Sequence, residues 1–432
     1  MRVRSGVIAG VLVLAGLGAA AEGTADQALL EIVRDVAARV GGVRGGALLR
    51  APVAVRAEAA ERELLAADRM DTLADPARLA ARGRSWADLG LSGPDGPARL
   101  VSALAGDLDL VGVQLEPVPR ILVDPGALSK ADFAPADGTG AEVLLATGVR
   151  PDEPVLAHAV THLRQFEREG RDPLAVTSAT TDALLAAAGT AEGEATLVAV
   201  RFLFRSMGLE DAVLDVDLDP ATLLDGRLVP RTLSTETGAV GELLRFVHRD
   251  GYDAVSSAFR AGGWAAVERM RAERVTTSDV LHPERAVPAV RPTVPSAADL
   301  PTGWRRVDID ALGEAAIVAL VAGATGKDNL GLLAADGWRG DALERWERAG
   351  APDSGVTRWT TLWAEASDAA DADYAFGRAL AARLADGALI GAGDGRRVAT
   401  VNGRRHELVR TGTQVRWTVG PPEMIPEPPP RG

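Results

Sequence analysis

The spacing of apolar and polar residues divides the chain into helical and strand-forming regions. Residues 26–40 (DQALLEIVRDVAARV) and 58–70 (EAAERELLAADRM) repeat apolar positions every three to four residues, which predicts amphipathic helices. After Val118 the pattern changes to short apolar runs in PRILVDPGALSK and AEVLLATGVRPDEP, each closed by Pro and Gly, which predict strands. Helical spacing returns at Pro154 and continues, with interruptions, to about Met270.

A second change of pattern marks the C-terminal part. Residues 286–303 hold four prolines and few large apolar residues, which indicates a linker. Beyond it, residues 307–325 and 374–384 have helical spacing, whereas TRWTTLW, RRVATVNG, RHELVR and TQVRWTV alternate as antiparallel strands do. We therefore expect a small α+β module here, with most of its tryptophans in the core.

These patterns predict an α+β fold that is mainly helical. The expected order of domains is a signal peptide at 1–21, a helical region at 22–117, a metal-site domain at 118–285, the linker at 286–303, the α+β module at 304–419 and a Pro-rich, disordered tail at 420–432. The tail is expected to be extended and mobile.

The N-terminus has the order of a secretory signal peptide. Arg2 and Arg4 precede an apolar run at residues 7–17, and small residues follow at 19–21. The run is shorter than the ~20 residues that a membrane-spanning helix needs, and no later segment is expected to reach that length. We expect a secreted or periplasmic protein that begins near Ala21 or Glu22 and has no membrane span; a retained single-helix anchor is the alternative.

Composition narrows the partners and the chemistry. The formal charge of -13 and the pI of about 5.0 argue against binding to nucleic acid or anionic lipid, because a phosphate-binding face concentrates Lys and Arg. The chain has no cysteine, which excludes disulfides and thiol catalysis. Any metal must therefore be bound by His, Asp or Glu.

Two of the five histidines have the spacing of metal ligands. His158 and His162 are four residues apart in VLAHAVTHLRQFERE, which places both imidazoles on one face of a helix. A third ligand would come from the next helical stretch, where Glu192 and Glu194 are two residues apart. That spacing is about 200° around a helix, so only one of them can face the histidines. A His pair alone is more often structural than metal-binding.

The surrounding sequence resembles a family of bacterial zinc metallopeptidases of the HExxH, gluzincin-like type. LAHAVTHLRQ and AEGEATLVAV are similar to the family's LAHELTHALQDQ and EGDATL, and GGWAAVERM with TTSDVLHPER is similar to its GGW and STEQVLHPEKY. AADGWRGDALERW and TRWTTLWAEASDAADADYAF are similar to its GWGGDRY and WDSEADA. The similarity runs in patches over residues 89–417. It implies a zincin-like core with an active-site helix and a following ligand helix.

The resemblance also implies the site. It makes His158, His162 and Glu192 the ligands of a zinc ion with an open fourth position. However, Ala159 stands where the family has the glutamate that acts as general base. We therefore expect an exported, degenerate pseudopeptidase that binds zinc, with a polypeptide as the expected partner in its cleft. The chain has no catalytic residue at position 159.

Two alternatives remain open. A slow or specialised metallohydrolase would need a substitute base, for which Glu153, Glu167 and Glu194 are the candidates. An exported scaffold or binding protein would have lost the metal as well.

The remaining histidines and a tyrosine are weaker candidates. His282 is a candidate oxyanion donor or further metal ligand, and Tyr252 is a candidate to stabilise a carbonyl oxygen, although each residue is more typical of packing. His248 and His406 lie beside charged residues and are expected to be solvated.

Overall fold

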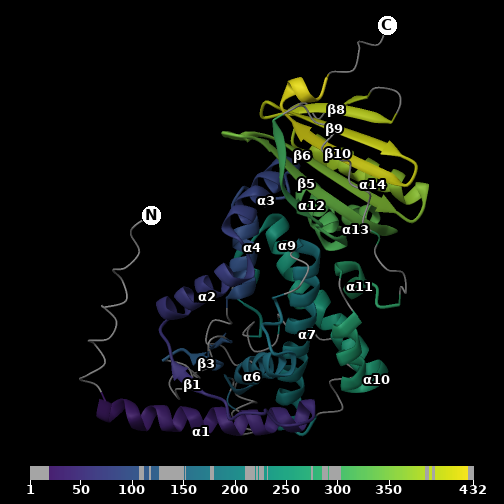
Figure 1. The fold of residues 1–432 in the computed structure, drawn as a ribbon. Coiled ribbons are helices and arrows are strands. Elements are labelled where there is room, and N and C mark those ends of the chain that lie inside the picture. Colours follow the sequence, from purple (N-terminus) through teal and green to yellow (C-terminus); the bar gives the residue numbers. More distant parts are fainter. Residues whose placement is uncertain are drawn as a thin grey trace.

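The computed structural model has a helical part and a C-terminal sheet (Figure 1). The residues that it describes are 19–106, 111–115, 118–125, 150, 152–175, 180–209, 219, 222, 228–230, 232–273, 276–284, 290, 303–384, 389–391 and 395–426. Four predicted features lie outside them in whole or in part. These are the body of the signal peptide at 1–18, the strand within 141–149, the linker except for residues 290 and 303, and the end of the tail at 427–432.

The helical part is built around α7. Its helices are α1 (Ala19–Arg44), α2 (Ala59–Leu73), α3 (Pro76–Leu89), α4 (Gly96–Ala105), α6 (Asp152–Glu169), α7 (Thr181–Ser206), α8 (Thr232–Thr235), α9 (Gly238–Arg245), the π-helix η4 (Phe246–Asp250), α10 (Gly251–Glu273) and α11 (Thr277–Leu281). A small sheet has the order β1 (Ala54–Arg56), β3 (Arg120–Val123), β2 (Val111–Gln114), with β1 parallel and β2 antiparallel to β3. The helices predicted at 26–40 and 58–70 and the strand at 120–123 are therefore confirmed.

The central helix α7 is longer and more apolar than the sequence pattern suggested. By length and composition it could cross a membrane, so the expectation that no later segment reaches such a length was wrong. In the structure, 78% of the most apolar 18-residue stretch of this helix is buried inside the protein. It packs against α6, α10 and η4, as a core helix does.

Glycines allow an unusually close crossing of α7 over the start of α10. A Cβ on Gly193 would lie 2.3 Å from the carbonyl oxygen of Gly251, and a Cβ on Gly251 would lie 2.3 Å from that of Gly189. No larger side chain fits between these backbones. This crossing fixes the residues that flank it, including Glu192 on α7 and His248 on η4.

The C-terminal part is a seven-stranded antiparallel sheet with helices against it (Figure 1). The strand order is β4 (Trp304–Asp310), β5 (Trp338–Arg348), β6 (Ala351–Trp363), β10 (Gln414–Gly420), β9 (Arg404–Thr411), β8 (Arg396–Val401), β7 (Ile390–Gly391), and the helices are α12 (Glu314–Thr325), α13 (Asp328–Ala335) and α14 (Ala366–Ala381). The ring centroid of Phe376 on α14 lies 5.2, 6.5 and 5.9 Å from the ring centroids of Trp359, Trp363 and Trp417, respectively. These tryptophans are in the core, as predicted.

Two details of this part differ from the prediction. Residues 304–310 form β4, and the helix expected from residue 307 begins only at Glu314, because the alternating WRRVDID forms the sheet's edge strand. The tail is not disordered from its start: Pro422–Met424 form a 3₁₀ helix (η6), and Ile425 is buried. Arg405 donates a hydrogen bond to the Ile425 carbonyl at 2.8 Å, which holds the tail against β9.

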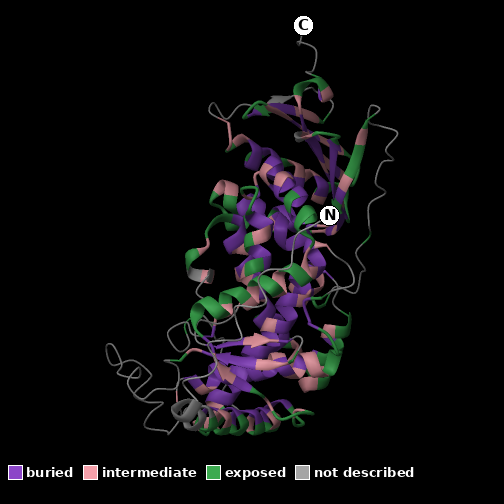
Figure 2. Ribbon diagram, turned by 60° about the vertical axis from the view of Figure 1, so that its left-hand side comes forward, coloured by how far each residue is buried: buried purple, intermediate pink, exposed green. Residues whose placement is uncertain are grey.

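The two parts share one core. α3 comes from the N-terminal region yet lies on the C-terminal sheet, where Arg82 pairs with Asp308 at 3.1 Å and Asp88 pairs with Arg345 at 2.7 Å. A single cluster of buried apolar residues runs from α1 through α7 to β10, and Figure 2 shows the buried residues continuing through both parts. The helical part and the C-terminal sheet are therefore joined by ion pairs and by a continuous apolar core.

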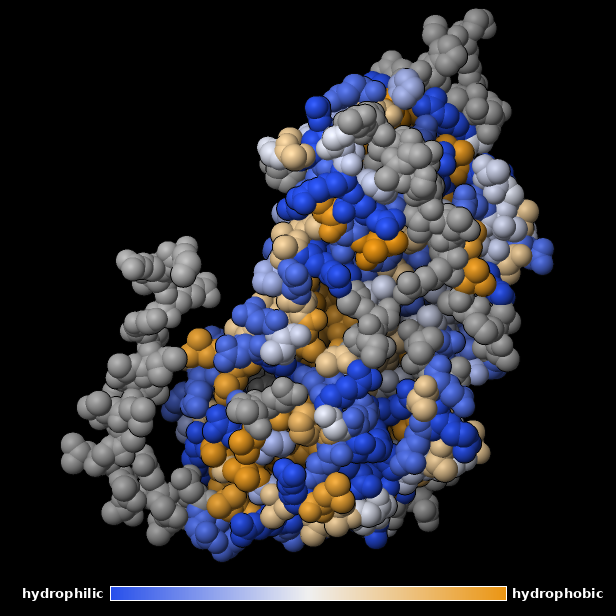
Figure 3. Space-filling view, viewed as in Figure 1, coloured by the Kyte–Doolittle hydropathy of each residue, from blue (hydrophilic) through white to orange (hydrophobic). Residues whose placement is uncertain are grey.

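Figure 3 shows hydrophilic residues spread over much of the coloured surface of this face. Apolar side chains gather at its lower left, over the region of β1 and β3. Exposed large apolar residues of this region include Leu49 and Val118.

Candidate metal centre

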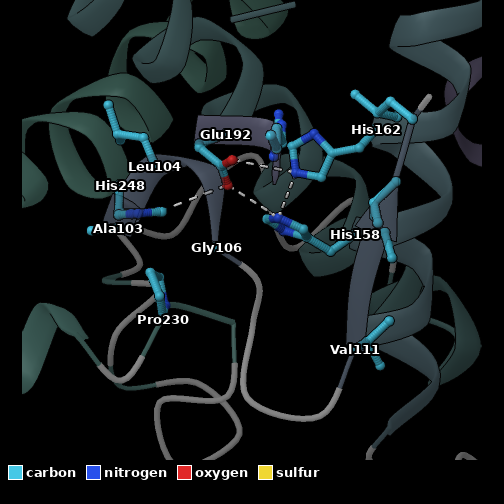
Figure 4. A pocket seen from close by; sticks show the side chains of 13 residues that line it. Ala103, Leu104, Gly106, Val111, His158, His162, Glu192, Pro230 and His248 are labelled. Atoms are coloured by element: carbon cyan, nitrogen blue, oxygen red, sulfur yellow. Dashed lines mark hydrogen bonds and ion pairs between the residues drawn. The ribbon is translucent and has the colours of Figure 1, made fainter. Parts of the chain in front are cut away.

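The two histidines of α6 and one glutamate of α7 meet at a single point. The Nε2 atoms of His158 and His162 lie 3.0 Å apart, because residues four apart stack on one helical face. Glu192 faces both: its Oε2 is 3.2 Å from His158 Nε2, and its Oε1 is 3.4 Å from His162 Nε2 (Figure 4). The structure therefore selects Glu192 over Glu194 as the third member.

This geometry fits a tetrahedral metal ion. Ligand atoms at about 2.0–2.1 Å from a tetrahedral zinc are separated by about 3.3 Å, which is close to the three distances between His158, His162 and Glu192. One ligand atom from each residue lies within 4.8 Å of the others. Two imidazole nitrogens and one carboxylate oxygen also form the donor set that zinc prefers in sites with an open position. The group could therefore hold a metal ion.

The electrostatics of the three residues are coupled. Burial lowers the pKa of His158, and the hydrogen bond with Glu192 opposes this only in part. Burial acts on His162 in the same direction, but the charge of Glu192 and its hydrogen bond outweigh it and raise the pKa of His162. Burial alone would raise the pKa of Glu192, yet the two histidines hold that pKa well below its usual range. The carboxylate is therefore ionised when it faces the imidazoles.

A glutamine fixes the tautomer of His162. Gln165 Nε2 donates hydrogen bonds to the Ala191 carbonyl at 2.9 Å and to Glu194 Oε2 at 3.2 Å. Both partners are acceptors, so the amide group must point to them and leave its oxygen facing His162 Nδ1 at 2.9 Å. His162 Nδ1 therefore carries the proton, and its Nε2 presents a lone pair to the centre. His158 has no such support, since its buried Nδ1 has no hydrogen-bond partner among the described residues.

Glu194 lies at the centre of an arginine cluster. Arg44 Nε donates to its Oε1 at 2.6 Å, Arg168 lies at 3.4 Å, and Arg271 also pairs with it. Burial would raise the pKa of Glu194, but these guanidinium groups hold it far below its usual range. The two acids of EGEA thus have different tasks: Glu192 faces the histidines, and Glu194 ties α1, α6 and α10 to α7.

A small cavity adjoins the three residues. It has a volume of about 40 Å³, room for a few water molecules. The residues that line it are Arg69, Ala103, Leu104, Gly106, Val111, Val113, Leu115, His158, Ala159, His162, Glu192, Pro230 and His248. Ala159 lines this cavity, so position 159 presents a methyl group and no carboxylate.

The three candidate substitute bases, Glu153, Glu167 and Glu194, are engaged elsewhere. Glu153 accepts a hydrogen bond from Arg39 at 2.7 Å, and Glu167 accepts from the backbone amides of Leu49 and Arg50 at 2.9 and 3.1 Å. Glu194 is held by its arginines. None of the three lines the cavity.

The weaker candidates lie away from the centre. His282 pairs with Glu314 at 2.7 Å, where α11 meets α12, and Tyr252 is buried in α10; neither lines the cavity. The expectation that His406 is solvated was wrong: it is 1% exposed, and its Nδ1 accepts a hydrogen bond from Trp417 Nε1 at 3.2 Å. It belongs to the core of the C-terminal sheet.

Sequence reasoning missed His248. It was expected to be solvated, yet it is buried and lines the cavity, with its Nδ1 3.9 Å from Glu192 Oε2 (Figure 4). Burial lowers its pKa to about 4, so the ring is neutral at pH 7. FVHRD has no recognisable metal-site spacing. The only indication in the sequence is the glycine that follows at Gly251, which permits the close crossing with α7.

Comparison with known proteins identifies one domain. The model of a family described as a domain of unknown function, DUF8575, matches residues 301–425, which cover the C-terminal sheet and its helices. No curated protein and no solved structure shows a significant match to the chain. The candidate metal centre lies outside the matched range.

Proposed function

We propose that this protein is an exported, degenerate zinc metallopeptidase: it binds zinc through His158, His162 and Glu192 and has little or no peptidase activity. The observation that carries the proposal is the convergence of two Nε2 atoms and one carboxylate within hydrogen-bond distance of one another, beside a cavity where Ala159 replaces the general base. Zinc would supply a Lewis acid there. The residues present explain binding, and the methyl group explains the lack of cleavage.

Four parts of the proposal rest on the resemblance and on residue chemistry. They are the identity of the metal as zinc, the zincin-like core, the export of the protein and its polypeptide partner. Two histidines and a carboxylate suit zinc better than Mg²⁺ or Ca²⁺, which prefer oxygen ligands. The order of charges, apolar run and small residues at the N-terminus supports export. Intact mass of the protein from its native host tests this last point, since retention of residues 1–20 would contradict it.

Metal analysis tests the first half of the proposal. We expect about one zinc ion per chain in the wild-type protein and loss of most of it in His158→Ala and Glu192→Gln, because each removes one of three ligands. Glu167→Gln is the matched control, an acid on the same helix as the histidines that does not line the cavity. A wild-type protein without metal would favour the scaffold alternative.

A gain-of-function variant tests the second half. Ala159→Glu restores a carboxylate next to His158, and Ala159→Gln has the same shape without a base. In zinc-loaded protein we expect chelator-sensitive peptide cleavage only in Ala159→Glu, about 10²-fold or more above wild type, since a general base typically contributes that much. A gain below about ten-fold would be only ~1.4 kcal/mol of barrier and would show that the cleft has changed elsewhere. Robust chelator-sensitive cleavage by the wild-type protein would refute the pseudopeptidase.

A further inference from the structure

His248 is the polar residue of the cavity that the proposed metal centre leaves without a task. Of the polar side chains that line the cavity among the described residues, His158, His162 and Glu192 form the centre. Arg69 is engaged outside it, in a two-bond pair with Asp172 at 2.7 and 3.0 Å.

The environment of His248 indicates a missing partner. The residue is 4% exposed, and its buried Nδ1 has no hydrogen-bond partner among the described residues. The 3.9 Å to Glu192 Oε2 is too long for a hydrogen bond. Because a buried polar nitrogen without a partner is costly, the arrangement favours a ligand that supplies one.

The backbone holds His248 firmly in this position. It lies in the middle of the π-helix η4, and such short π-helical turns are frequent at functional sites. Three residues later, Gly251 is pressed against Gly189 and Gly193 of α7. The imidazole is therefore fixed on the opposite side of Glu192 from the two α6 histidines (Figure 4).

We propose that the cavity is a binding site for a small carboxylate, which a metal held by His158, His162 and Glu192 would bind on one side and His248 would hydrogen-bond on the other. This inference rests on the proposed metal binding. The neighbouring Glu192 carboxylate favours the tautomer with the proton on Nδ1, so His248 presents a donor. A metal dication favours an anion at this position.

The size and walls of the cavity select the ligand further. A cavity of about 40 Å³ suits a carboxylate with a short alkyl group. It is too small to hold a folded protein. Leu104, Val111 and Leu115 provide an apolar wall for that alkyl group. His248 is therefore a residue that determines ligand affinity, separate from the metal ligands.

Cobalt-loaded full-length protein allows metal uptake and ligand binding to be measured separately. Visible absorption of the bound Co²⁺ is followed during titration with acetate in wild type, His248→Ala and His248→Asn, whose amide keeps a donor. His406→Asn is the matched control, a second buried histidine far from the cavity in the C-terminal sheet. We expect the acetate dissociation constant to rise about ten- to hundred-fold in His248→Ala, which is the range for a lost hydrogen bond to a charged group, and less in His248→Asn. All variants should bind as much cobalt per chain as wild type, and His406→Asn should also have the wild-type acetate dissociation constant.

The other outcomes overturn the inference in distinguishable ways. Equal acetate affinity in wild type and His248→Ala, with metal bound in both, would refute the role of His248 and leave the metal centre standing. Loss of cobalt or a changed coordination spectrum in His248→Ala would show that His248 is itself a ligand. No cobalt uptake by wild type would refute the proposed metal binding, and this inference with it.

Discussion

Glu192 and Glu194 are two residues apart on α7 and point to opposite environments. Glu192 lies 3.2 Å from His158 Nε2, whereas Glu194 lies 2.6 Å from Arg44 Nε. One carboxylate belongs to the candidate metal centre, and the other neutralises buried arginines. Within one turn of helix, Glu192 therefore serves the candidate metal centre and Glu194 serves the stability of the fold.

Glu194→Gln should destabilise the metal-free protein by about 3–5 kcal/mol, because it leaves buried guanidinium groups without their counter-charge. The depressed pKa of Glu194 stabilises the fold above the unfolded-state pKa of about 4.3 and loses this effect as pH falls below it, so the difference between variant and wild type should shrink in acid. Urea unfolding at several pH values in a chelator measures this. Glu192→Gln, the matched variant, should cost much less; equal losses would contradict the division of tasks.

Gln165→Leu should weaken metal binding about 10- to 100-fold, as loss of a partner that orients a metal-binding His typically does. Competition with a chromophoric chelator measures the affinity. In the metal-free protein, ¹⁵N NMR should show His162 protonated on Nδ1 in wild type and mixed tautomers in the variant. Gln27→Leu, an exposed glutamine on α1, is the control. An unchanged tautomer would mean that Gln165 does not orient His162.

Gly193→Ala should destabilise the protein by about 1–3 kcal/mol, because its Cβ would overlap the Gly251 carbonyl and push η4 from α7. Gly42→Ala, in α1, is the control. The atom nearest to its added Cβ would be 3.7 Å away, so this substitution should be neutral or stabilise the protein by up to about 1 kcal/mol. Thermal or urea unfolding compares them. A neutral Gly193→Ala would show that the crossing can relax.

His406 should make the fold less stable in acid. Burial, with Arg383 and Arg404 nearby, lowers its pKa to about 3, so the unfolded chain binds a proton that the folded chain does not. Stability is full above the unfolded pKa of about 6.5 and should fall by ~1.4 kcal/mol per pH unit from there down to the folded value. His406→Gln, which can still accept from Trp417, should remove this slope, as urea unfolding between pH 4.5 and 7.5 would show. Parallel pH profiles of variant and wild type would refute it.

The sequence by itself determined the local elements and the ligand pair. Apolar spacing predicted α1, α2 and the antiparallel strands of the C-terminal sheet, because periodicity follows directly from which face is buried. His158 and His162 were found in the same way, since a helix places residues four apart side by side. The helix boundary at Glu314 was missed because an alternating edge strand merges with an apolar helix in a single-sequence pattern.

Tertiary structure decided which distant residues join that pair. Helical spacing alone left Glu192 and Glu194 open, and the resemblance implied Glu192. The packing of α7 against α6 turns Glu192 toward the histidines and Glu194 toward the arginines. His248 enters the site because glycines let the backbone of α7 approach the start of α10, directly after the π-helical turn that carries His248. Such contacts depend on how helices pack, and side chains far apart in the chain leave no periodic trace of that packing in the sequence.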